Sequence, residues 1–114
     1  MASNDRDPLE IEVQQNEDRT LVVIAGELDV STASYLYDAL SDLELTDPHH
    51  VVLDLAKVTF MDSTGLSVIV TEHKRLDQVN GTLTIFSPPS SIRRLFEITG
   101  LTTTLDIVPA DEER

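Results

Sequence analysis

The chain has 114 residues and no cysteine, a length typical of one domain, so disulfides, thiolate metal sites and cysteine nucleophiles are excluded. Its 21 acidic and 8 basic side chains give a net charge of −13, which argues against binding to nucleic acid or an anionic membrane surface and favours a protein partner. The sequence has no apolar run near the roughly 20 residues of a membrane span and shows no secretory signal, so we expect a cytoplasmic protein.

Two strands and one helix are predicted in the first part of the chain. Apolar and polar residues alternate over 9–14, which predicts a strand with one face in water, and a turn at 16–19 joins it to a continuous apolar run at 21–25. Ser31 and Thr32 are good helix N-cap residues. Apolar residues at three- and four-residue steps then predict one buried helix stripe, made up of Ala33, Leu36, Tyr37, Leu40 and Leu43.

The rest of the chain alternates strands with helices. Strands are predicted at 51–55, at 82–86 and, at the edge of the sheet, at 104–108. A helix ending at Asn80-Gly81 follows the first of these strands, and a third helix stops at Gly100. The middle helix is expected to bury Leu66, Ile69, Val70 and Leu76, with His73 on or beside this stripe. Its side chains expected to face outward are Ser67, Thr71, Glu72, Lys74 and Arg75.

The predicted order of elements is β-β-α-β-α-β-α-β. Crossovers of more than ten residues that each carry a helix make the later strands parallel, whereas the first two strands form an antiparallel hairpin. We therefore predict an α/β fold, a single small domain at 9–108 with helices packed against a mixed β-sheet. Residues 1–8 are mostly polar and residues 109–114 mostly acidic, so both segments are expected to be flexible tails.

The sequence contains no complete set of catalytic or metal-binding residues. Its four glycines are not clustered in a phosphate-binding loop, and there is no G-x-S-x-G nucleophile motif. His49 and His50 are expected in a solvated loop, and His73 is expected to pack on its helix rather than act as a base. We therefore predict a protein that is not an enzyme and uses no cofactor or metal.

One segment combines an acid, two hydroxyls and a glycine at the junction of a strand and a helix: Asp62-Ser63-Thr64-Gly65. Asp62 or Ser63 can cap the helix by accepting from its first free N–H groups, for about 1 kcal/mol. Capping does not need a second hydroxyl. A phosphate at this point would meet the free N–H groups and the positive end of the helix dipole, and would add a charge of about −1.5 to −2. Capping and a phosphorylation switch both stay open on these residues alone.

Three motifs make the sequence similar to a known family. The segment 60–66 (FMDSTGL), preceded by 26–29 (GELD) and followed by 91–96 (SIRRLF) with 99–101 (TGL), resembles the STAS domain of bacterial anti-sigma factor antagonists. The motifs have the family's order and spacing, and the resemblance covers residues 9–108. It implies a β-sheet with helices packed against it, in agreement with the predicted fold.

The resemblance implies a partner-switching mechanism. In this family the unphosphorylated antagonist binds an anti-sigma factor that is also a serine/threonine kinase, which frees a sigma factor. The kinase phosphorylates the antagonist on the hydroxyl residue before the motif's glycine, and a phosphatase reverses the modification. Carried over to this chain, the phospho-acceptor is Thr64, beside Gly65. Ser63 is expected to cap the helix, and Asp62 to orient the acceptor or the helix end.

The resemblance also suggests which surface meets the kinase. Glu27 and Asp29 match the family loop beside the phosphorylation site, although loop acids near a helix start have an equally plain structural explanation. Ser67 and Thr71, on the outer side of the following helix, complete the expected docking surface. The sequence departs from the family at two positions, since Thr64 stands where stand-alone antagonists more often have serine, and Ser67 where glycine is common.

Two functions follow from this resemblance. The first is an anti-sigma factor antagonist, expected to be a monomer when free and to bind neither nucleic acid nor membrane. The alternative is a STAS scaffold or sensory module of a larger signalling or transport-associated complex outside a sigma cascade, which the threonine at position 64 keeps open.

Overall fold

The protein's structure, a computed structural model, describes residues 9–109. In chain order its elements are β1 (Leu9–Gln15), β2 (Arg19–Leu28), α1 (Ala33–Ser41), β3 (His50–Met61), α2 (Ser63–Asp77), β4 (Thr82–Phe86), α3 (Ser90–Ile98), the short 3₁₀ helix η2 (Leu101–Thr103) and β5 (Asp106–Val108). Apart from Pro109, the tails predicted at 1–8 and 109–114 lie outside the described residues. No helix within 9–109 is long and apolar enough to cross a membrane.

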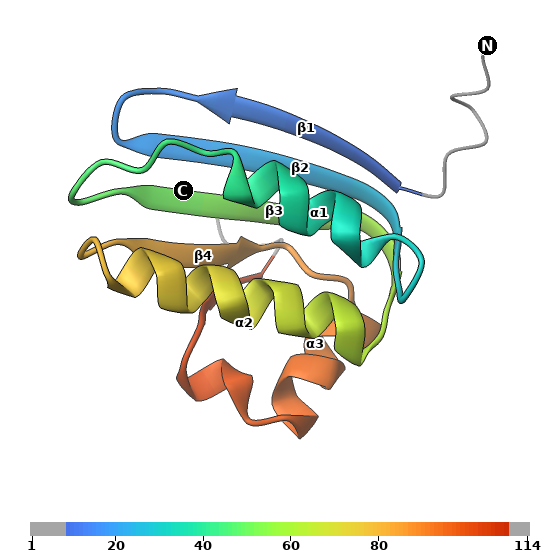
Figure 1. Ribbon diagram of the computed structural model, residues 1–114. Coiled ribbons are helices and arrows are strands. Elements are labelled where there is room, and N and C mark those ends of the chain that lie inside the picture. The colour runs from blue at the N-terminus through green and yellow to red at the C-terminus, as the bar shows by residue number, and fades with distance from the viewer. Residues whose placement is uncertain (1–8, 110–114) are drawn as a thin grey trace, which may run out of the picture.

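The five strands form one sheet with the spatial order β1-β2-β3-β4-β5 (Figure 1). β1 pairs antiparallel with β2, in a register that runs from Leu9 opposite Gly26 to Gln15 opposite Thr20. The other three neighbouring pairs are parallel, because each crossover between them is long enough to return the chain to the same end of the sheet. The predicted α/β fold, with an antiparallel hairpin followed by parallel strands, is confirmed.

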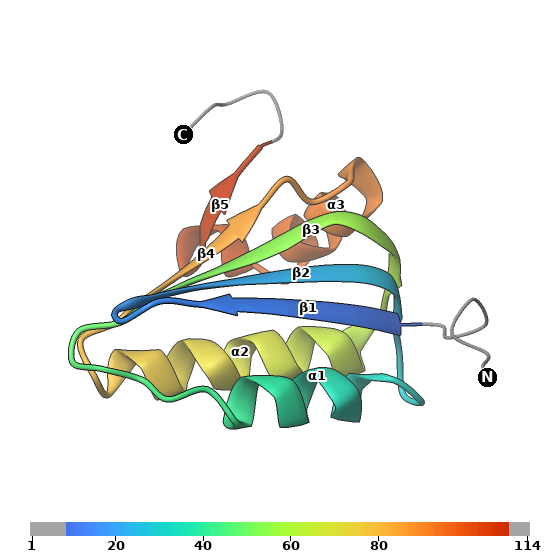
Figure 2. The ribbon, with the colours of Figure 1, turned by 90° about the horizontal axis from the view of Figure 1, so that it is seen from above.

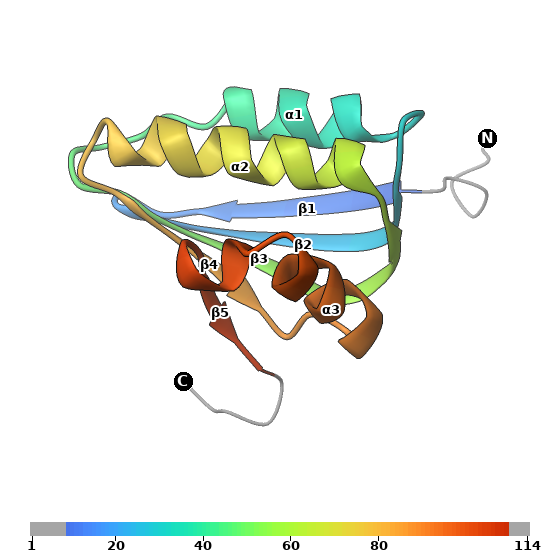
Figure 3. The same ribbon diagram turned by 90° about the horizontal axis from the view of Figure 1, so that it is seen from below.

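Helices α1 and α2 lie side by side on one face of the sheet (Figure 2), and α3 and η2 lie near β4 and β5 (Figure 3). A single apolar core fills the space between this face and the helices. Its fully buried members include Ile24, Leu53 and Ile85 from the strands and Leu36, Ile69 and Phe96 from the helices. Each side chain of this size contributes about 1.5–3 kcal/mol when it is buried.

β3 is longer than the sequence predicted, because it continues past residue 55 as far as Met61. Its exposed residues Ala56 and Lys57 interrupt the apolar run on which the prediction rested. The pairing of β2 with β3 shifts register between Val23 and Ala25 and again between Gly26 and Glu27, which accommodates this stretch. The extension matters for function, since it brings the end of β3 beside the end of β2.

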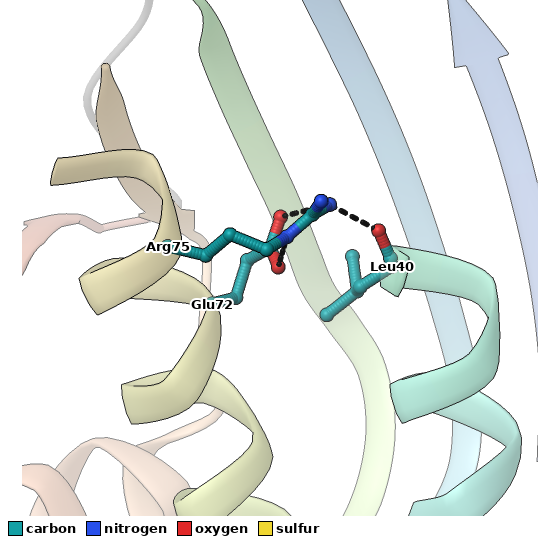
Figure 4. A network of polar contacts seen from close by, with 3 residues as sticks. All are labelled: Leu40, Glu72 and Arg75. Atoms are coloured by element: carbon teal, nitrogen blue, oxygen red, sulfur yellow. Dashed lines mark hydrogen bonds and ion pairs between the residues drawn. The ribbon is translucent and has the colours of Figure 1, made fainter. Parts of the chain in front are cut away.

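The contact between α1 and α2 differs from the prediction. Tyr37, predicted in the buried stripe, is 49% exposed, whereas Glu72, expected to face outward, is only 3% exposed. Glu72 pairs with Arg75, whose Nε lies 3.1 Å from Oε1, and the guanidinium also donates to the Leu40 carbonyl (Figure 4). The outer flank of the stripe on α2 therefore carries an ion pair that links the two helices. Val70, also predicted to be buried, is half-buried.

The prediction that His49 lies in solvent is wrong, because its side chain is only 2% exposed. The backbone N–H of Thr46 donates to Nδ1 at 3.1 Å, and Nε2 lies 2.8 Å from the Thr20 hydroxyl oxygen. Because Nδ1 accepts an N–H, the proton of the neutral ring is on Nε2, which donates to Thr20. His49 thus joins the loop before β3 to β2.

Candidate functional site

Asp62 holds the junction between β3 and α2. It has the extended backbone of a helix N-cap, with φ −114° and ψ −169°. Its Oδ1 accepts from the backbone N–H groups of Thr64 at 2.9 Å and Gly65 at 3.3 Å. The first turn of a helix leaves such groups without intrahelical partners. Asp62 is therefore the cap of α2, and Ser63, for which the resemblance implied this role, is instead the first helical residue.

Gly65 lets the first turn of α2 approach the end of β2. A Cβ at this position would lie 2.9 Å from Leu28 Cβ, 3.1 Å from the Leu28 carbonyl oxygen and 3.1 Å from Met61 Cγ. Across the same contact, the backbone N–H of Asp62 donates to the Leu28 carbonyl at 3.1 Å. Because protein interiors are close-packed, a larger residue would push α2 away from β2.

The two hydroxyls of the motif differ in access. Ser63 is exposed, whereas Thr64 is half-buried. Ser63, Ser67 and Thr71 follow each other at four-residue steps and share one exposed side of α2. This side borders an open groove of about 370 Å³, which is also lined by three apolar side chains: Leu66, Val70 and Leu101. Lys74 lines the groove as well, and Thr64 does not.

The end of β2 lies directly beside the junction. In the parallel pairing of β2 with β3, Glu27 stands opposite Phe60 and Leu28 opposite Met61. Glu27 is exposed, as are the side chains of Phe60 (48%) and of Val30 in the loop that follows (80%). Neither of these two apolar residues was predicted to be exposed. Val30 was detectable as an apolar residue in a polar loop, whereas Phe60 fits a strand pattern and gives no signal.

Asp29 fixes the shape of the loop between β2 and α1. Its Oδ1 accepts from the Ser31 hydroxyl at 2.8 Å, from the Ser31 N–H at 3.0 Å and from the Thr32 N–H at 3.2 Å. These hydrogen bonds, that of the Ser31 hydroxyl above all, hold the pKa of Asp29 below its usual value. The Thr32 hydroxyl donates to the Glu27 carbonyl at 2.6 Å. Asp29 is thus engaged within the loop, which leaves Glu27 as the freer acid beside the motif.

The carboxyl of Glu72 belongs to the other side of α2. Burial raises the pKa of Glu72, and the hydrogen bond and positive charge of Arg75 oppose this shift. Glu72 lies in the crevice between α1 and α2 with Tyr37 and Val68, and it does not line the groove that Ser63 lines. It therefore serves the helix contact. Within 9–109, no three His, Asp or Glu side chains are grouped so as to hold a metal ion.

A comparison with protein families assigns this architecture. The model of the STAS domain matches residues 10–113. The chain belongs to the STAS domain family. The anti-sigma-B factor antagonist of Listeria monocytogenes is 35% identical over 92% of this chain and 93% of that protein, and the one from Staphylococcus epidermidis is 41% identical over 82% and 86%. A crystal structure of an anti-sigma factor antagonist from Mycobacterium paratuberculosis has a TM-score of 0.79 at 25% identity, covering 97% of this chain and 92% of that one.

The motifs that carry the resemblance have different roles in this STAS domain. Segments 26–29 and 60–66 meet at the junction through the pairing of β2 with β3. Segment 91–96 lies in α3, where Ile92 and Phe96 are buried in the core, and Gly100 follows that helix with a φ of 79°, which favours glycine. Leu101 then lines the groove along α2. The first two segments thus build the site, and the last two mainly build the fold beside it.

Proposed function

We propose that this STAS domain is an anti-sigma factor antagonist. It binds a kinase-type anti-sigma factor and thereby frees a sigma factor, phosphorylation of the first turn of α2 ends the binding, and a phosphatase restores it. The names of relatives at 35% and 41% identity support this class of function. The structural observation that carries it is the exposed Ser63 hydroxyl in the first turn of a helix whose cap is already filled by Asp62.

Two hydroxyls are candidates for the phospho-acceptor. The resemblance assigns Thr64, which is half-buried and does not line the groove, whereas Ser63 is exposed and does. Phosphoryl transfer needs the acceptor oxygen in line with the γ-phosphate, so access favours Ser63. We propose Ser63 as the acceptor, with Thr64 as the alternative that the experiment below separates.

A phosphate on Ser63 changes binding more than folding. The free N–H groups and positive dipole end of α2 favour an anion at this point, so the fold tolerates it. In the complex, the same phosphate adds about −1.5 to −2 charges next to Asp62 and close to the nucleotide phosphates that the kinase holds. A cost of about 3 kcal/mol from this repulsion lowers affinity about a hundredfold.

The docking surface surrounds the acceptor. It consists of Glu27 at the end of β2, with Asp29 shaping the loop that follows, and of Ser67 and Thr71 on α2. The exposed apolar side chains of Val30 and Phe60 extend this surface on the side of β2. Apolar anchors of this kind supply most of the binding energy in protein interfaces, and the polar groups around them fix the register.

The experiment incubates the purified chain with a candidate kinase-type anti-sigma factor and ATP. Ser63→Ala and Thr64→Val each remove one hydroxyl with little change in volume, and Ser67→Ala is the control on the same side of α2. We expect intact-mass spectrometry to show one phosphate on the wild type, Thr64→Val and Ser67→Ala, and none on Ser63→Ala. Loss only in Thr64→Val assigns the acceptor to Thr64.

Calorimetry of the same proteins tests the switch itself. The unmodified wild type, Ser63→Ala and Thr64→Val should all bind the anti-sigma factor. The phosphorylated wild type should bind it about a hundredfold more weakly. Equal affinity before and after phosphorylation refutes the switch. Absence of binding in every form refutes the antagonist function and favours the scaffold alternative.

A further inference from the structure

An apolar strip lies on the sheet face that is turned away from α1 and α2. Leu21, Val23 and Ala25 alternate along β2 with residues that face the core, and Val52 on β3 stands opposite Leu21. The outer strip, as we name these four residues, belongs neither to the core cluster nor to the side chains packed against it. The three β2 members are half-buried, and Val52 is buried, with 9% of its side chain exposed.

Acidic side chains border the outer strip on both sides. On β1, Glu10 stands opposite Ala25 and Glu12 opposite Val23, and both acids are exposed. On β3, Asp54 stands opposite Val23. Neighbouring strands are about 4.8 Å apart, so the acids of β1 and β3 flank the strip at about 10 Å, close to the diameter of an α-helix.

Basic side chains on this face stand at the two ends of the strip. Arg19 begins β2, and Lys57 on β3 pairs with Ala25. At the Arg19 end, a hollow of about 230 Å³ opens between Gln14, Asn16, Leu21 and Val52. The middle of the face is therefore apolar with acidic margins, and it has a depression that can receive a side chain.

Among the described residues, no helix covers this part of the sheet: α1 and α2 lie on the opposite face of β1–β3 (Figures 2 and 3). Apolar surface left open between charged margins is typical of an interaction site. The charge of this chain, −13, opposes the approach of a second copy and favours a basic partner.

We propose that the outer strip is a second docking surface, which takes a basic amphipathic segment of another protein. The apolar ridge of that segment lies along Leu21, Val23 and Ala25, and its lysine or arginine side chains meet Glu10 and Glu12 on one side and Asp54 on the other. This surface lies on the opposite side of the sheet from α2. A partner there therefore leaves the Ser63 groove free, and both surfaces can be occupied at once.

The test uses the full chain labelled with ¹⁵N and three synthetic helical peptides of about 14 residues. The first combines leucine on one face with lysine on both flanks. The second has glutamate in place of lysine, and the third has serine in place of leucine. Amide shifts in the protein locate the binding, and titrations give the dissociation constants.

We expect the leucine–lysine peptide to shift amides of residues 21–25 and 52–54. Glu10→Gln/Glu12→Gln removes two exposed acids and should weaken binding about fivefold. The charge-matched control Asp38→Asn/Asp42→Asn, at the C-terminal end of α1, should change it less than about twofold. The glutamate and serine peptides should each bind at least about tenfold more weakly. Ser63→Ala should leave all of these values unchanged, which separates this surface from the proposed phosphorylation site.

Four outcomes would overturn the proposal. Shifts that concentrate on α1 or α2 place the peptide elsewhere, and equal weakening by the two double variants shows that only net charge matters. A serine peptide that binds as well as the leucine peptide removes any role for the strip. A concentration-dependent dimer that is lost in Glu10→Gln/Glu12→Gln, measured by light scattering, assigns this face to a second copy instead.

Discussion

Arg75→Met tests how α1 and α2 are held together. Glu72 is 3% exposed, Arg75 Nε lies 3.1 Å from its Oε1, and the guanidinium donates to the Leu40 carbonyl. Methionine keeps much of the aliphatic stem but removes the charge, so the Glu72 carboxylate is left buried without its cation. Breaking a fully buried pair costs about 3–5 kcal/mol. Because the Arg75 side chain is 35% exposed, solvent screens part of this loss, and we expect about 2 kcal/mol at pH 8.

The loss should depend on pH in a definite direction. Burial holds the pKa of Glu72 above its usual value, and removal of Arg75 raises it further. When the pKa of a carboxyl is raised in the folded state, its ionised form destabilises the fold, and this cost is complete at pH values above the folded-state pKa. As the pH falls through the folded-state pKa, protonation removes the buried charge and stability recovers. The difference in unfolding free energy between wild type and Arg75→Met should therefore shrink as the pH falls from 8 to 5.

Urea unfolding followed by circular dichroism measures this difference at both pH values. Lys74→Met is the matched control, since Lys74 is an exposed neighbour on α2 and loses the same charge; we expect less than about 0.5 kcal/mol. Adding Glu72→Gln to Arg75→Met should recover most of the loss at pH 8. The reasoning is refuted if Arg75→Met and Lys74→Met are equally stable, or if the effect of Arg75→Met does not change with pH.

Three further substitutions test the junction and the loop beside it. Gly65→Ala places a Cβ 2.9 Å from Leu28 Cβ and should cost about 1–3 kcal/mol in urea unfolding, and an unchanged midpoint would contradict the close contact. Asp62→Ala removes the acceptor of two N–H groups and should cost about 1 kcal/mol by thermal unfolding, whereas Asp62→Asn, which keeps an acceptor, should cost less. Because its pKa is lowered in the folded state, the Asp29 carboxylate stabilises the fold above its unfolded-state pKa, and this stabilisation is lost as the pH falls through the folded-state pKa. The melting temperature of Asp29→Ala should therefore lie below that of wild type at about pH 7 and converge with it near pH 2.

The order of elements and the direction of the strands could be predicted because they depend on local patterns. The apolar runs at 21–25 and 51–55 lie within β2 and β3, and the lengths of the crossovers determine that the later strands are parallel. The ends of two helices were also predictable from single residues. Asn80 has a φ of 55° after α2 and Gly100 a φ of 79° after α3, a backbone region that these residue types tolerate.

Burial at the flanks of a helix stripe could not be predicted in the same way. Helical periodicity predicts which residues share a face of a helix. It does not predict how far across that face a neighbouring helix makes contact. Tyr37 and Glu72 both lie at this margin, and tertiary packing buries the acid and exposes the aromatic ring. His49 is buried for a similar reason, since one of its partners, Thr20, is 29 residues away in the sequence.

The position of the candidate site followed from its motif, but the accessibility of its hydroxyls did not. Segment 60–66 identifies the junction because an acid, hydroxyls and a glycine follow a strand and start a helix. Which hydroxyl faces solvent depends on how the first turn of α2 seats against β2, and this is determined by the contact of Gly65 with Leu28. Thr64 falls on the half-buried side of that contact and Ser63 on the exposed side.

This seating places the stabilising contacts and the proposed phosphorylation site on different sides of one helix. Asp62 accepts from the N–H groups of Thr64 and Gly65, so the Ser63 hydroxyl is not needed as a cap. The side of α2 that bears Ile69, Glu72 and Leu76 holds the core and α1, whereas Ser63, Ser67 and Thr71 on the other side are all exposed. A phosphate on the side of Ser63 thus meets a favourable helix dipole and disturbs no packing. It should therefore change the affinity for the partner rather than the stability of the fold.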